Sequence, residues 1–295
     1  MKAKEMIIKS AFSEEEYSVG EVEVHFAGWE HARKHFSTFF SGGKWVFRAA
    51  KNPDAVFLSE FERNHPESAN RANIIKAYLS EFSSNISLYL KGDVAPQRND
   101  ILENLSLMNY YGAPDPLLDW SFSPYVALYS ALSSDEVLKK PITIFCINTS
   151  ILENICREFL YSEKLRIPSE APFGEYRRAD IFDSVFEYSL KDNPGFIFPF
   201  NPTRKTISFL QRQGFFTFNG GFLKDFEYSL ISMSKLCAKR NIAQPENFIN
   251  KVTISASASD EIMDDLFLMN ITSMTLNNGI RGYAKSVKEY ARRRL

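Results

Sequence analysis

The chain has 295 residues, of which 44% are hydrophobic and 24% are charged, and its formal net charge at pH 7 is −1. This composition excludes disordered and fibrous proteins. The near-neutral charge argues against bulk electrostatic binding to nucleic acid or an anionic membrane, although not against a local basic patch. No apolar run is long enough to span a bilayer or to form a secretory signal, so we expect a soluble cytoplasmic protein.

In the N-terminal half, hydrophobic periodicity predicts short strands between helices. The expected elements are a strand at 20–28, a helix at 29–40, a strand at 45–48, and helices at 68–90, 99–109 and 124–133. Ser123 and Pro124 give the last of these helices an N-cap and a proline at its first position, where a missing N–H costs nothing.

The C-terminal half predicts further strands and helices. The expected elements are strands at 141–147, 194–199, 214–218 and 248–256, a helix at 259–266, a short edge strand at 274–276 and a basic helix from 283 to the end. Ser259 is the expected cap of the helix at 259–266. The rest of 160–202 shows no period and is expected to be irregular. Since no flexible linker divides the chain, we expect one α+β domain over 1–295, with a mixed, mainly antiparallel small sheet or sheets and flanking helices.

The cysteines and histidines do not indicate a metal or covalent site. The three cysteines are widely spaced in apolar surroundings, which favours buried reduced thiols. They are Cys146, Cys156 and Cys237. His31 and His35 share a helical face, but Arg33 and Lys34 between them disfavour a bound cation. We therefore expect a solvated helix face and no metal.

The segment 110–132 holds the densest set of candidate site residues. It places Asp119 and Trp120 between apolar leucines and a helix start, where a carboxylate and an indole are costly unless something satisfies them. Asp119 could act as a general base, a ligand anchor or a helix N-cap, and its spacing favours the cap. Tyr110, Tyr111 and Trp120 could stack on a nucleobase or nicotinamide, or could equally pack the core.

Two other segments place polar groups at strand ends. Arg48 follows strand-forming residues and precedes small alanines, so it could hold a phosphate or carboxylate bidentately, or could pair with Glu60 or Glu62. The segment 211–213 sets amide and guanidinium groups before Gly214, which permits close approach of a ligand; solvated residues at a strand entry are the simpler interpretation. The common nucleotide-loop and zinc signatures are absent from the sequence.

The order of these motifs resembles the FRG domain family, which is named for a Phe-Arg-Gly motif. The matching segments are Phe47-Arg48, Tyr111-Gly112-Ala113-Pro114, Leu117-Leu118-Asp119-Trp120 and Gln213-Gly214-Phe215-Phe216. The sequence also departs from the family pattern. Ala49 replaces a glycine, Asn109-Tyr110 replaces Gln-His, Asp115-Pro116 replaces Thr-Arg, and Arg212 replaces the first glutamine of Gln-Gln-Gly.

The family resemblance and a more distant one to the ADP-ribosyltransferase plan together imply an ADP-ribosyltransferase-like α+β fold. They imply an ADP-ribosyltransferase-like toxin or phage-defence enzyme that acts on a nicotinamide dinucleotide, with NAD as substrate and no permanently bound cofactor. Arg48 would hold the phosphates, Asp119 would stabilise a developing oxocarbenium charge and Gln213 would contact the ribose. The substrate-binding residues would be Tyr111, Gly112, Trp120 and Ser121.

A second interpretation is a non-catalytic sensor or adaptor of a bacterial defence system that binds a nucleotide or a protein. The replaced motif positions favour this interpretation. A metal-dependent nuclease is a third hypothesis, but the sequence lacks the carboxylate cluster that such chemistry requires. The expected partners are a nucleotide or a macromolecular target; no membrane partner is expected, and nucleic acid is not indicated.

Overall fold

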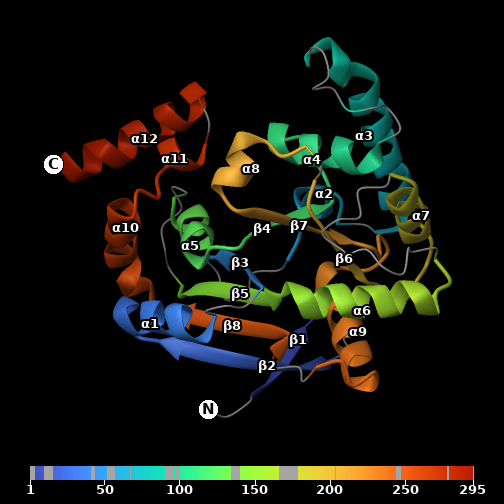
Figure 1. Ribbon diagram of the computed structural model, residues 1–295, viewed down its shortest axis with the longest axis horizontal. Coiled ribbons are helices and arrows are strands. Elements are labelled where there is room, and N and C mark those ends of the chain that lie inside the picture. The colour runs from blue at the N-terminus through green and yellow to red at the C-terminus, as the bar shows by residue number, and fades with distance from the viewer. Residues whose placement is uncertain are drawn as a thin grey trace.

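A mixed β-sheet forms the centre of the protein and helices cover both of its faces (Figure 1). The computed structural model describes residues 4–9, 16–40, 44–51, 57–66, 68–90, 96, 100–133, 140–165, 179–202, 204–243, 247–277 and 279–294. Along the sheet the strand order is β1-β2-β8-β5-β3-β4-β7-β6. The strands are β1 (Lys4–Lys9), β2 (Glu16–Phe26), β3 (Trp45–Ala50), β4 (Leu117–Ser121), β5 (Ile142–Asn148), β6 (Ile197–Phe200), β7 (Gly214–Asn219) and β8 (Ile249–Ile254).

The sheet is mainly antiparallel, because β2 and β8 pair in parallel and the other neighbouring strands pair antiparallel. The predicted α+β class with a mixed, mainly antiparallel sheet is thereby confirmed. The sheet is larger than the small sheets expected. That residues 1–295 form one domain stays a prediction.

The helices complete the two layers that cover the sheet. They are α1 (Trp29–Phe39), α2 (Glu60–Asn64), α3 (Arg71–Asn85), α4 (Ile101–Tyr111), α5 (Pro124–Leu132), α6 (Thr149–Ser162), α7 (Ala179–Ser189), α8 (Ile207–Gln211), α9 (Phe226–Lys239), α10 (Ser259–Leu268), α11 (Ser273–Leu276) and α12 (Gly279–Arg294). None of these described helices is long and apolar enough to cross a membrane.

Each face of the sheet packs against its own hydrophobic cluster. Because successive side chains of a strand point to opposite faces, Val46 of β3 joins one cluster while Trp45 and Phe47 join the other. The first cluster also takes side chains from α3, α4, α6, α7 and α9, and the second takes them from α1, α5 and α10. This two-sided core fixes the positions of the central strands β3 and β4, which carry the candidate site.

Several local predictions can be compared with the structure. The Ser123 side chain accepts a hydrogen bond from the Val126 N–H, which confirms the predicted cap of α5. The three cysteines are free and buried, as expected. His35 is half-buried against Phe39 rather than solvated, with ring centroids 5.1 Å apart, and this burial lowers its pKa.

Three other predictions were wrong. The expected edge strand at 274–276 is the helix α11, because Thr272 forms a capping box with Thr275. Ser259 is the first residue of α10 and not its cap, since the turn Ala256–Ala258 leads directly into this helix. Part of the region expected to be irregular forms α7, whereas residues 166–178 of that region lie outside the described part of the chain.

Candidate functional site

Strands β3 and β4 bring Arg48 and Asp119 together across a separation of 71 residues. Arg48 Nη1 donates to Asp119 Oδ1 at 2.6 Å and to the Asp119 carbonyl oxygen at 2.7 Å. Asp119 lies in the middle of a strand, so the helix cap that its spacing favoured was wrong. Arg48 pairs with this carboxylate rather than with Glu60 or Glu62.

The surroundings of Asp119 keep its carboxylate ionised. Burial among protein atoms acts to raise its pKa, but the charge and hydrogen bond of Arg48, together with the charge of Arg212, lower this pKa below its usual value on balance. The side chain is nevertheless 58% exposed, because it faces open space at the surface of the sheet. At neutral pH the site therefore presents a negative carboxylate to any bound ligand.

Trp120 follows Asp119 and points to the opposite face of β4. Its Nε1 donates to Thr217 Oγ1 at 2.9 Å inside the core, and its ring stacks on Phe57 with centroids 5.9 Å apart. The ring is 3% exposed. Of the two interpretations of this residue, the structure favours core packing, although its atoms border the site.

Two adjoining cavities meet at Asp119. The larger has a volume of about 480 Å³ and lies between α4, α8, the ends of β4 and β7, and the start of α12. The smaller has a volume of about 230 Å³ and lies between β3, β4 and α5. Asp119, Trp120 and Arg212 line both cavities, and Arg48 lines the smaller one. A ligand of two linked parts could therefore place one part in each cavity, with the link between them beside the Asp119 carboxylate.

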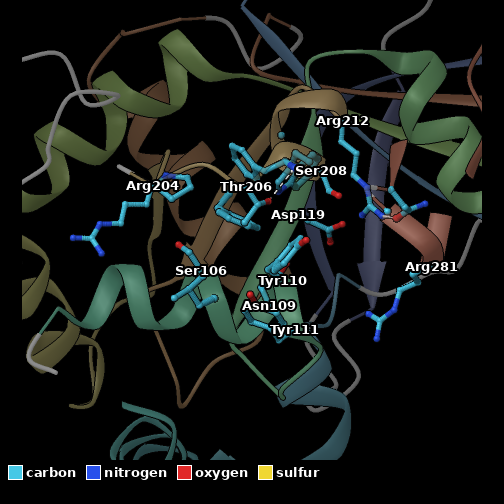
Figure 2. A pocket seen from close by; sticks show the side chains of 18 of the residues that line it. Ser106, Asn109, Tyr110, Tyr111, Asp119, Arg204, Thr206, Ser208, Arg212 and Arg281 are labelled. Carbon is cyan, nitrogen blue, oxygen red and sulfur yellow. Dashed lines mark hydrogen bonds between the residues drawn. The ribbon is translucent and has the colours of Figure 1, made fainter. Parts of the chain in front are cut away.

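The larger cavity is rich in cations and aromatic rings. Figure 2 shows Asp119 between the side chains of α4 below it and those of α8 above it. Among the described residues that line this cavity, four are cationic and Asp119 is the one carboxylate. The cations are Arg204, Arg212, Arg281 and Lys285. This excess of positive charge favours an anionic ligand such as a phosphate ester.

Arg212 is the one cation of this set that the sequence indicated, through the segment 211–213, where solvated residues were the simpler interpretation; Arg204, Arg281 and Lys285 were not indicated. The Arg212 Nε donates to the Leu276 carbonyl oxygen at 3.4 Å and its Nη2 donates to Asn277 Oδ1, which holds the guanidinium beside Asp119. Gln213, one of the three predicted catalytic residues with Arg48 and Asp119, adopts a left-handed backbone with φ of 50° and is exposed. It lines neither cavity, and its predicted contact with a ribose has no support in this geometry.

The remaining predicted residues lie near the site in different roles. Tyr111 is 49% exposed and lines the larger cavity. Gly112 ends α4 with φ of 79° and lines neither cavity, so its position is that of a helix C-cap. Ser121 lines the smaller cavity, and its Oγ donates to the Arg212 carbonyl oxygen at 2.7 Å. The structure thus gathers Arg48, Asp119, Tyr111 and Ser121 but leaves Gln213 and Gly112 outside.

Two of the departures from the family pattern are bonded to each other. Asn109 Nδ2 donates to Asp115 Oδ2 at 3.2 Å, and the Leu117 N–H donates to Asp115 Oδ1 at 2.8 Å. Burial raises the pKa of Asp115 well above its ordinary value, against the opposing effect of these bonds. The pair fixes the turn between α4 and β4, so it positions the strand that carries Asp119.

These observations define an α+β protein whose central strands hold an arginine–aspartate pair between two cavities. The family model described as FRG domain matches residues 43–140, about a third of the chain. The predicted resemblance to the FRG domain family is thereby confirmed for this segment. The segment includes Arg48 and Asp119 but ends before Arg212. No curated protein and no solved structure matches the chain.

Proposed function

We propose that the protein binds NAD across the two cavities and cleaves the bond between its nicotinamide and ribose, as an ADP-ribosyltransferase-like enzyme. The observation that carries this proposal is the ionised Asp119, paired with Arg48, at the boundary that both cavities share. The proposed setting, a toxin or phage-defence system in a bacterial cytoplasm, rests on the family resemblance alone.

The site suits the parts of a dinucleotide. Both cavities lie within or near the size range of small-molecule sites, which is about 300–1,000 Å³. The diphosphate would bind between Arg212 and Arg48, because guanidinium groups bind phosphate oxygens bidentately. Tyr110 and Tyr111 line the larger cavity and offer partly exposed rings for stacking on a base.

In the proposed reaction the bond between the ribose C1′ and the nicotinamide nitrogen breaks. Its electron pair goes to the nitrogen, which neutralises the positive charge of the nicotinamide ring and leaves positive charge on the ribose. The Asp119 carboxylate would stabilise this oxocarbenium charge. Water or a hydroxyl of an acceptor then bonds to C1′ and releases its proton to solvent.

A second candidate function is a nucleotide sensor that binds without cleavage. Two observations favour it: Arg48 is engaged by Asp119 before any ligand binds, and Gln213 lies outside both cavities. Such a protein would use the same cations to bind phosphate groups, but it would not cleave the bound nucleotide.

The experiment that separates the two functions is incubation with NAD labelled in the nicotinamide ring, with and without cell lysate. Released nicotinamide and ADP-ribosyl transfer are measured for the wild type, for Asp119→Asn and for Glu261→Gln, a matched acid-to-amide change at an exposed position of α10. Release by the wild type and Glu261→Gln, but not by Asp119→Asn, supports the enzyme. Thermal stabilisation by NAD without release supports the sensor, and the absence of both effects refutes both functions.

A further inference from the structure

The C-terminal helix α12 concentrates positive charge that the net charge of the chain conceals. Residues 279–294 contain six lysines and arginines against one glutamate, in a chain whose net charge is −1. Arg281, Lys285 and Lys288 are spaced by four and three residues, so they lie on one helical face. All three side chains are exposed.

A side of α12 next to this basic face is fixed to the protein by Glu289, the one acidic residue of the helix, which lies four residues after Lys285. The Glu289 carboxylate accepts hydrogen bonds from the Ser273 N–H at 3.1 Å, from the Ser273 hydroxyl at 2.7 Å and from the Tyr129 hydroxyl. Gly282 and Ser286 are buried on this side. The orientation of the basic face is therefore set by specific bonds to α5 and α11.

This basic face joins the rim of the larger cavity. Arg281 and Lys285 line the cavity together with Tyr110 and Tyr111 from α4. In Figure 2 the side chains of Arg281 and Tyr111 both lie below that of Asp119. The two tyrosine rings lie edge to face with centroids 4.8 Å apart and are 37% and 49% exposed. Within the described part of the chain, neither Arg281 nor Lys285 forms an ion pair.

We infer that this rim, made of Arg281, Lys285, Tyr110 and Tyr111, binds a single-stranded nucleic acid. Unpaired cations beside exposed aromatic rings match a strand whose phosphates alternate with bases, since every base has a face that can stack. An acidic peptide offers carboxylates to the cations, but it offers no base that could stack on the tyrosine rings. Because the cations border a concave cavity, a bilayer surface reaches them poorly. The inference goes beyond the proposed function and does not depend on NAD cleavage.

The test is fluorescence anisotropy with labelled single-stranded DNA and RNA of about 12 nucleotides, measured over a range of salt concentrations without NAD. The Arg281→Gln/Lys285→Gln variant removes two phosphate contacts. We expect it to bind about 25-fold more weakly near 0.1 M salt and to lower the slope of log K against log salt by about 1.4. The matched control is Lys239→Gln/Arg240→Gln, which removes the same charge from exposed positions at the end of α9, away from α12 (Figure 1).

Further arms identify the ligand and separate this inference from the proposed function. Tyr111→Leu should weaken oligonucleotide binding by about tenfold, because stacking on an aromatic ring is lost. Arg48→Gln should lose NAD binding but keep oligonucleotide binding, so the two ideas can fail separately. The DNA and RNA arms show which strand is preferred. The inference is overturned if the wild type binds neither strand, if Arg281→Gln/Lys285→Gln binds as well as its control, or if polyglutamate or phosphatidylserine vesicles bind more tightly than either strand.

Discussion

The pair between Arg48 and Asp119 makes a quantitative prediction about stability. A unit-charge pair about 4 Å apart at an effective dielectric constant near 20 would contribute about 4 kcal/mol. The Asp119 side chain is 58% exposed and that of Arg48 is 25% exposed, so solvent screens most of this energy. Exposed pairs contribute about 0.2–1 kcal/mol. We therefore expect a coupling free energy of about 1 kcal/mol between the two side chains.

The geometry further predicts unequal effects of the two single substitutions. Asp119→Ala removes the carboxylate but leaves the Asp119 carbonyl, which still accepts from Arg48 Nη1. It should cost less than about 1 kcal/mol. Arg48→Met removes both bonds and should cost about 2 kcal/mol, since each hydrogen bond contributes about 1 kcal/mol. Urea unfolding of the wild type, the two single variants and the double variant measures these values.

The coupling should also depend on pH with a defined sign. The pKa of Asp119 is lowered in the folded state, so its contribution is fully present above the unfolded pKa of about 3.9 and is lost as pH falls through the folded value. Measurements at pH 7, 5 and 3 follow this loss. A coupling of zero at pH 7, or one that grows as the pH falls, would refute the ion pair as the reason for this arrangement.

Three further substitutions test other parts of the structure. Trp120→Phe should destabilise the fold by about 1–3 kcal/mol, because the buried Thr217 hydroxyl loses its partner, while NAD binding stays unchanged; loss of NAD binding in a fully stable variant would contradict the core role. Burial raises the pKa of Glu227 from 4.5 to about 7, so its proton is held in the folded state and stability should fall by roughly 3 kcal/mol as pH rises between these values. In urea unfolding, the stability of Glu227→Gln should change much less over this pH range than that of the wild type. If the variant loses as much stability as the wild type, Glu227 is not the source of the pH dependence. Gly214→Ala would place a Cβ 2.6 Å from the Phe209 ring and should cost about 1–3 kcal/mol in thermal unfolding; an unaltered Tm would show that the ring moves freely.

The sequence predicted elements well where one local pattern determines them. The β5 segment is rich in β-branched and aromatic residues, and its buried strand has nearly the predicted bounds. The helix α9 was not predicted, because its buried positions include Glu227, Ser229 and Ser234, so no apolar stripe stands out. The edge strand expected at 274–276 was wrong for a related reason, since a single capping box decides so short a segment.

The candidate site was predictable in its position but not in its detailed geometry. The motif order indicated that Arg48 and Asp119 belong together, yet their direct bond depends on the register of β3 against β4. Arg212 rather than Gln213 lines the cavities because the left-handed backbone of Gln213 turns its side chain to solvent. Because side-chain direction at such a turn follows the backbone, composition alone favours neither residue.

Calorimetric titration of NAD into the wild type and into Arg48→Gln tests the central claim most directly. The claim predicts that the wild type binds NAD and that Arg48→Gln binds at least about tenfold more weakly, because a charge-assisted bond to phosphate contributes about 1.5–3 kcal/mol. A wild type that does not bind NAD would contradict the proposed site, and so would a variant that binds NAD as tightly as the wild type.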